Sequence, residues 1–128
     1  MVEESMWGEV PQSGKGIKLP FDYLREQAII LSEMYAHNLI GNVTQDVSSS
    51  GKVSIDFDIR VPPLGSYSYS LLKVVHGLDI YPLMIYGLAN KTEYKCVDEK
   101  EFKHDLRELL SSPQVKKVIE NILTLIKK

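Results

Sequence analysis

An unbroken alternation of apolar and polar side chains occupies residues 52–61 of this chain. Apolar residues stand at positions 53, 55, 57, 59 and 61, and the polar residues between them are charged or serine. Because side chains alternate between the two faces of a β-strand, this spacing predicts a strand with one buried and one solvated face. Such a strand is typical of an antiparallel sheet that is covered on one face only.

Short turn-forming segments separate this strand from its neighbours. Ser48–Gly51 precedes it, Pro62–Gly65 follows it, and His76–Asp79 closes the next segment. Connections this short join antiparallel neighbours, because a parallel crossover needs a dozen or more residues. Pro82 cannot donate to a sheet ladder and indicates an edge position or a bulge in the fourth strand. The predicted strands are residues 39–47, 53–61, 67–75 and 80–85, with a candidate fifth at 94–97.

Helical periodicity is present in the sequence before and after the predicted strands. Between Phe21 and His37 the apolar residues recur at gaps of three and four, which places them on one face of a helix. Asp98 begins a second helix of the capping-box kind, and Pro113 begins a third. We therefore predict an α+β fold: an N-terminal helix, a four- to five-stranded antiparallel meander, and a C-terminal helical pair packed on one face.

Length and composition indicate one globular domain. The 128 residues are 44% hydrophobic and 25% charged, as in ordinary folded domains. Residues 1–20 contain prolines and glycines without helical or strand periodicity. We therefore expect a flexible N-terminal arm at 1–20, followed by a single α+β domain at 21–128.

Charge and cysteine content argue against several classes of protein. A formal net charge of −2 provides no overall positive field for nucleic acid. Cys96 is the only cysteine, which excludes an internal disulfide and fits a reducing compartment. Glu3 and Glu4 stand where a secretory signal would carry positive charge, and no apolar run approaches the roughly twenty residues needed to cross a bilayer. We expect a cytoplasmic protein without cofactor, nucleic-acid or membrane partner.

Asp56 and Asp58 are a candidate metal site on the polar face of the alternating strand. Their positions two residues apart point both carboxylates to the same side, roughly 7 Å from one another, where they could share a divalent cation. The alternative is a solvated strand face balanced by Lys52 and Arg60. That alternative is favoured, because any alternating strand needs polar residues there.

Asp79, Glu93 and Lys95 form a second candidate site. Their spacing resembles the Asp, then Glu-x-Lys pattern of restriction-endonuclease-like phosphodiesterases. The resemblance implies that both carboxylates hold a magnesium ion and that the lysine helps activate the attacking water. The proline that usually precedes the aspartate is missing, and the net charge is unsuited to gripping DNA. A metal-dependent nuclease is thus the alternative function, and it requires the two carboxylates to lie within roughly 5 Å.

The third predicted strand is the main candidate for a contact surface. Tyr67 and Tyr69 are residues favoured at interfaces, although they could equally pack inward with their hydroxyls at the rim. Leu72 and Val74 make the second half of the strand apolar on both faces, as in a strand covered by its own chain or by a neighbour. We therefore expect a non-catalytic protein-interaction or regulatory protein, with a homodimer as the simplest assembly.

Several short segments of the chain form a recognisable combination. They are Leu24–Ala28, Tyr67-x-Tyr69 with Leu71-Leu72, Val75-His76, Tyr81-Pro82, and Phe102 leading to Leu106. Together these segments resemble a group of short uncharacterised bacterial proteins. The likeness covers roughly residues 17–126 and implies a bacterial intracellular domain. It transfers no site residue, since no activity is assigned to that group.

Overall fold

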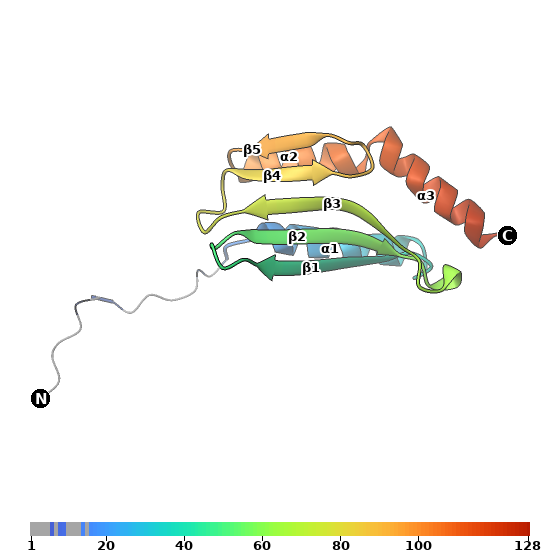
Figure 1. Ribbon diagram of the computed structural model, residues 1–128, viewed down its shortest axis with the longest axis horizontal. Coiled ribbons are helices and arrows are strands. Elements are labelled where there is room, and N and C mark those ends of the chain that lie inside the picture. The colour runs from blue at the N-terminus through green and yellow to red at the C-terminus, as the bar shows by residue number, and fades with distance from the viewer. Residues whose placement is uncertain (1–5, 7, 10–13, 15) are drawn as a thin grey trace, which may run out of the picture.

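A helix, a five-stranded meander and a helical pair follow one another along the chain (Figure 1). The computed structural model describes residues 6, 8–9, 14 and 16–128, so most of the predicted arm at 1–20 lies outside the described residues. The elements are α1 (Pro20–Met34), β1 (Ile40–Val47), β2 (Val53–Arg60), the 3-10 turn η1 (Pro62–Leu64), β3 (Ser68–His76), β4 (Leu83–Gly87), β5 (Glu93–Cys96), α2 (Glu99–Leu110) and α3 (Pro113–Ile126).

The sheet is a simple antiparallel meander in the order β1-β2-β3-β4-β5. α1 packs on β1, and α2 packs on β5 and β4. Both helices lie behind the sheet in Figure 1, and α3 extends past its end near η1. The predicted α+β fold, with its helical pair and its candidate fifth strand, is confirmed.

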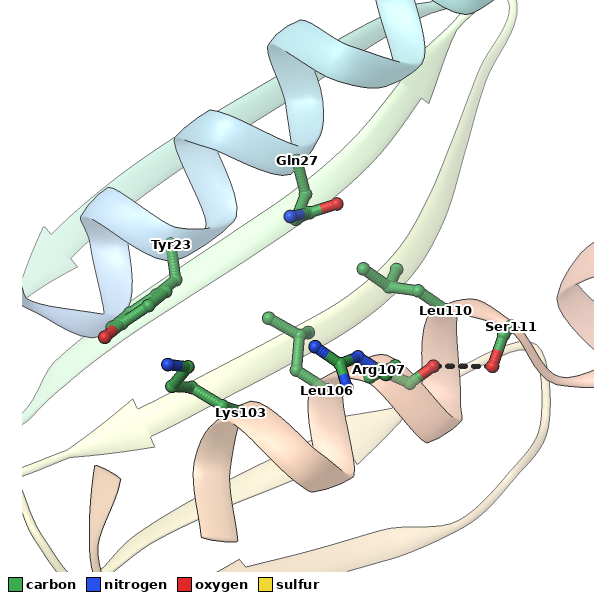
Figure 2. A pocket seen from close by; sticks show the side chains of 7 residues that line it. All are labelled: Tyr23, Gln27, Lys103, Leu106, Arg107, Leu110 and Ser111. Atoms are coloured by element: carbon green, nitrogen blue, oxygen red, sulfur yellow. Dashed lines mark hydrogen bonds between the residues drawn. The ribbon is translucent and has the colours of Figure 1, made fainter. Parts of the chain in front are cut away.

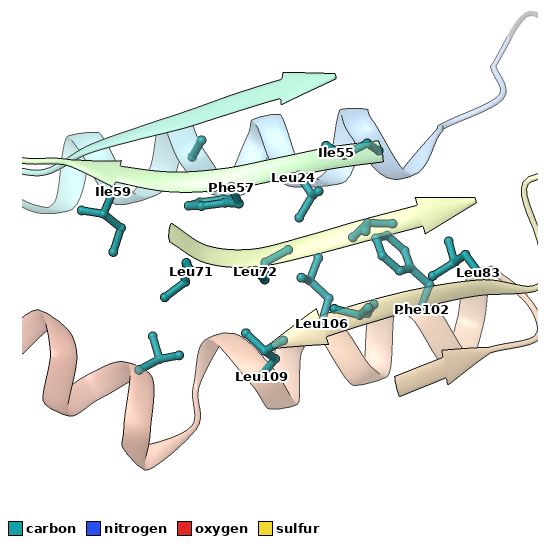
Figure 3. Close-up of a cluster of buried hydrophobic side chains, with 14 of the residues drawn as sticks. Leu24, Ile55, Phe57, Ile59, Leu71, Leu72, Leu83, Phe102, Leu106 and Leu109 are labelled. Carbon is teal, nitrogen blue, oxygen red and sulfur yellow. The ribbon is translucent and has the colours of Figure 1, made fainter. Parts of the chain in front are cut away.

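β2 has the two different faces that its alternation predicts. Ile55, Phe57 and Ile59 are buried, whereas the aspartates between them point to the opposite face. Full burial of each such apolar side chain stabilises the fold by about 1.5–3 kcal/mol. Figure 3 shows these residues meeting side chains from α1, β3, β4 and α2 in one core. Its labelled members are Leu24, Ile55, Phe57, Ile59, Leu71, Leu72, Leu83, Phe102, Leu106 and Leu109.

β3 contains a bulge that changes which of its residues share a face. Leu72 pairs with Phe57, and Ser70 pairs with the next residue of β2, Asp58. Leu71 is therefore an extra residue in β3. Tyr69 and Leu72 consequently both lie opposite core residues of β2, whereas strict alternation predicts opposite faces. Lys73 and Val75 lie on the outer face of the sheet. The second half of β3, predicted to be apolar on both faces, is therefore apolar on its inner face and mixed on its outer face.

α1 approaches β1 closely because β1 has a glycine beneath the helix. A Cβ atom at Gly41 would lie only 2.6 Å from the Cβ of Ala28. One turn further along α1, Ser32 Oγ donates to the Ala28 carbonyl oxygen at 2.9 Å and accepts the Gly41 N–H at 3.1 Å. These contacts hold α1 over the first strand of the sheet rather than over its middle.

The ends of two helices show how local sequence sets the boundaries. α1 ends at Met34 rather than at the predicted His37, because Ala36 and His37 have φ angles of 50° and 66°, which a right-handed helix does not contain. α2 begins as predicted: Asp98 Oδ1 accepts the Glu101 N–H at 2.8 Å.

β4 begins later than predicted and lies inside the sheet. It starts at Leu83 instead of Ile80, because Pro82 has no N–H to donate to a ladder. Pro82 therefore precedes the strand, and it marks neither an edge strand nor a bulge. β3 and β5 flank β4 on its two sides.

Candidate binding surfaces

α1 and α2 stand on either side of β3 and leave a groove above it. α1 rests on β1 and α2 rests on β4 and β5, so three to four strand spacings, or roughly 14–19 Å, separate the helix axes. Helices in direct contact pack at about 8–10 Å. The gap is therefore wider than a helix–helix contact.

The end of this groove near the start of α1 is a cavity of about 310 Å³ (Figure 2). Tyr23 and Gln27 enter it from α1, and Gln27 points into the space between the helices. Lys103 and Arg107 line it from α2, one helical turn apart. Leu106, between the two cations, gives the cavity an apolar wall. This end of the groove combines two positive charges, an amide and an aromatic ring.

The other end of the groove is a second cavity of about 180 Å³. Gln27 and Leu110 line both cavities, so the two adjoin. Ile30 and Met34 of α1 face Ile119 of α3 across this end. Apart from Gln27 every side chain that lines it is apolar. The groove therefore changes from cationic to apolar along its length.

Tyr23 is held in a fixed position at the cationic end. Its hydroxyl donates to Glu99 Oε2 at 2.7 Å, and its ring meets the Phe102 ring edge-on with centroids 5.8 Å apart. The hydrogen bond to the Glu99 carboxylate raises the pKa of Tyr23 to about 12, so the phenol keeps its proton. Lys103 Nζ lies 5.8 Å from the centroid of the Tyr23 ring, within cation–π range.

The Cys96 side chain and the hydroxyl group of Tyr81 are buried and have raised pKa values. Burial raises the pKa of Cys96 to about 12, and its Sγ donates to Asp105 Oδ2 at 3.4 Å. Burial also raises the pKa of Tyr81 to about 12, and its buried hydroxyl has no hydrogen-bond partner among the described residues. A thiol with so high a pKa stays protonated at neutral pH and is a poor nucleophile.

β1 forms one edge of the sheet along its whole length of eight residues. The Gly41 N–H donates to Ser32 instead of to β2, so alternation along the strand points the N–H groups of Val43, Gln45 and Val47 to the free edge. The Val47 side chain is 58% exposed. Unpaired edges of this kind are templates for pairing with another strand.

Ile29 adds an apolar side chain beside that edge. Gln27 and Ile29 flank Ala28, which packs on β1, and Gln27 faces the groove. The helical period therefore directs Ile29 to the opposite side of α1, beyond the free edge of β1. Ile29 is 51% exposed. An unpaired backbone and an exposed apolar side chain thus lie together on this side of the molecule.

The proposed nuclease residues are not brought together. Asp79 lies in the loop before β4, whereas Glu93 is paired with Tyr86, near the far end of β4. Leu83, where β4 begins, lies three residues, or about 10 Å, from Tyr86 along the strand. Lys95 shares the outer face of β5 with Glu93. The carboxylates are therefore separated by much more than the roughly 5 Å that one shared ion permits.

Asp56 and Asp58 do share the outer face of β2, as the sequence predicts. They lie opposite Thr44 and Asn42 on β1, and Asp56 also lies opposite Lys73 on β3. Both are partly buried among these neighbours. A lysine directly across the ladder matches the interpretation of a charge-balanced strand face.

The four predicted interaction residues differ in how deeply they are buried. Leu72 and Val74 are buried in the core of their own chain, so they are wrong as candidates for contact with a partner. Tyr69 is partly buried against the same core, and Tyr67 is 41% exposed just before β3. The bulge at Leu71 is the physical reason, because it turns this part of β3 toward the helices.

One cluster on α2 has the composition of a metal site. His104 Nδ1 lies 3.2 Å from Asp105 Oδ1 and 3.8 Å from Glu108 Oε2. Within the described ranges it is the one group of three such side chains whose ligand atoms lie within 4.8 Å of one another. None of the metal ligands predicted from the sequence belongs to it. His104 and Glu108 are exposed, and the geometry is that of a surface ion-pair cluster.

Comparison with known proteins found no relative of this chain. No protein-family model, curated protein or solved structure matches the chain significantly. The resemblance to short bacterial proteins therefore stays a prediction. In the part of the chain that the structure describes, every helix is too short or too polar to span a bilayer.

Proposed function

We propose that this chain is a non-catalytic protein-interaction protein of the bacterial cytoplasm that pairs with a second copy of itself through the free edge of β1. The observation that carries the proposal is the free edge of β1, to which Val43, Gln45 and Val47 direct their N–H groups, with Ile29 and Val47 exposed beside it. Strand addition supplies backbone hydrogen bonds, and flanking apolar side chains supply burial. The lone buried thiol suits a reducing cytoplasm.

The composition of the edge supports pairing with an identical strand. β1 has one charged residue, Asp46, near its end. If two copies pair antiparallel about Thr44, each Asp46 lies opposite an Asn42 of the other copy, so no like charges meet. The same arrangement brings the two α1 helices side by side with Ile29 between them. A closed two-fold pair also leaves no growing edge at β1.

The chemistry of the described residues supports a non-catalytic role. The carboxylates of the nuclease hypothesis lie apart, and the Cys96 thiol is protonated and buried. The tyrosine with a raised pKa at the groove, Tyr23, is bound to a carboxylate rather than poised to transfer a proton. Binding is the activity that these surfaces support best.

Sedimentation velocity across a concentration series tests the proposal. We expect the wild-type chain to dimerise and Ile29→Lys to shift the equilibrium at least tenfold toward monomer. Leu125→Lys is the matched control, because Leu125 is 54% exposed on α3 away from β1, and it should dimerise like wild type. A wild-type chain that stays monomeric into the millimolar range would contradict the proposal, as would equal effects of the two variants.

A further inference from the structure

We propose that the groove between α1 and α2 binds an amphiphilic organic acid, with the acid group at Lys103 and Arg107 and the hydrocarbon tail toward Met34. The two adjoining cavities, of about 310 and 180 Å³, supply the space. Sites for small organic ligands commonly enclose about 300–1,000 Å³, so these cavities suit a small ligand. The site lies on the opposite side of α1 from Ile29, so it is independent of the proposed dimer contact.

The cationic end selects an acid. Lys103 and Arg107 stand one turn apart on the groove side of α2, and neither forms an ion pair with any described carboxylate. Glu99 accepts the hydroxyl of Tyr23, which lines the same cavity. The other acids of α2 with a described partner lie away from it: Glu101 accepts the Val97 N–H, and Asp105 and Glu108 lie beside His104. A carboxylate between the two cations would gain charge-assisted hydrogen bonds.

The apolar end selects a flexible hydrocarbon chain. Along α1 the lining runs from Tyr23 to Met34, about 16 Å at the helical rise per residue. Ile30 is 46% exposed and Met34 is 65% exposed, although both face a groove in which they could be buried. A linear tail of medium length would cover both side chains while its head group reaches the cations.

A second copy of α3 fits the groove less well. Its two lysines outnumber its single glutamate and carry the same charge as Lys103 and Arg107. An anionic chain avoids this conflict.

Calorimetric titration with sodium decanoate below its micelle concentration tests the inference. We expect saturable binding of one decanoate per chain, and at least tenfold weaker binding of decyltrimethylammonium, which has the same tail and the opposite charge. Equal binding of the two amphiphiles would overturn the inference, since Lys103 and Arg107 would then not discriminate between a negative and a positive head group. Absence of decanoate binding would overturn it as well, including the case in which the chain binds only to phosphatidylglycerol vesicles.

Charge reversal at the groove supplies the matched comparison. The double variant Lys103→Glu/Arg107→Glu should lose decanoate binding at least tenfold and gain affinity for decyltrimethylammonium. Lys100→Glu, on the same helix but outside the groove lining, should bind decanoate like wild type. Circular dichroism of all variants checks that they are folded. If both sets of variants lose decanoate binding equally, the acid does not bind at Lys103 and Arg107.

Discussion

Gly41 of β1 and Ala28 of α1 are packed so closely that a Cβ atom at Gly41 would lie 2.5 Å from the Ala28 Cα. The nearest atoms belong to helix backbone, which cannot rotate aside as a long side chain would. The position of α1, and with it one wall of the groove and one flank of the β1 edge, depends on this contact.

Gly41→Ala should therefore destabilise the fold through overpacking. We expect the free energy of unfolding to fall by about 1–3 kcal/mol, measured by urea denaturation. Gly77→Ala is the control, because nothing lies within 4 Å of a Cβ atom at that position. A Gly41→Ala variant as stable as Gly77→Ala would show that α1 is not fixed by close packing on β1.

Tyr81→Phe should leave the stability at neutral pH unchanged or raise it by about 1 kcal/mol. The Tyr81 hydroxyl is buried without a described hydrogen-bond partner, and an unsatisfied buried polar group costs about 1–3 kcal/mol. Tyr23→Phe is the informative comparison, since it removes a hydroxyl bonded to Glu99. Thermal unfolding of both variants measures the difference. A clear loss of stability in Tyr81→Phe would mean that its hydroxyl has a partner.

Stability should decline in alkaline solution. The pKa values of Cys96, Tyr23 and Tyr81 rise on folding from 9.0, 10.0 and 10.0 to about 12. As the pH increases above 9 the unfolded chain loses these protons first, so the folded chain binds more protons. The contribution of these three groups to the free energy of unfolding should then be constant below about pH 8 and fall between pH 9 and about 12.

Urea midpoints measured across that pH range test this expectation, and Tyr81→Phe should flatten the decline between pH 10 and 12. A wild-type midpoint that stays constant up to pH 12 would contradict the burial of Cys96 and Tyr81 and the Tyr23–Glu99 hydrogen bond.

Local sequence patterns predicted the elements well and the surfaces poorly. The alternation in β2 and the Asp98 cap are properties of neighbouring residues, and both predictions are confirmed. The bulge at Leu71 is different. Two adjacent leucines do not show which residue is extra until β3 is paired with β2. That error made Leu72 and Val74 look available to a partner.

The groove was missed for a similar reason. Lys103 and Arg107 have a visible spacing of four residues, which by itself indicates only a common helix face. Their role depends on which strands α1 and α2 cover, and that is decided by contacts such as Gly41 with Ala28. The free edge of β1 was easier to predict from the sequence, since the first strand of a meander has a neighbour on one side only.

Amide hydrogen exchange along β1 tests the central claim of pairing most directly. The N–H groups of Val43 and Gln45 point to the free edge and should become protected as protein concentration increases, and Ile29→Lys should abolish that protection. The N–H of Thr44, which faces β2, should be protected at every concentration and serves as the internal control. Fast exchange of Val43 and Gln45 at all concentrations, beside a protected Thr44, would contradict pairing at this edge.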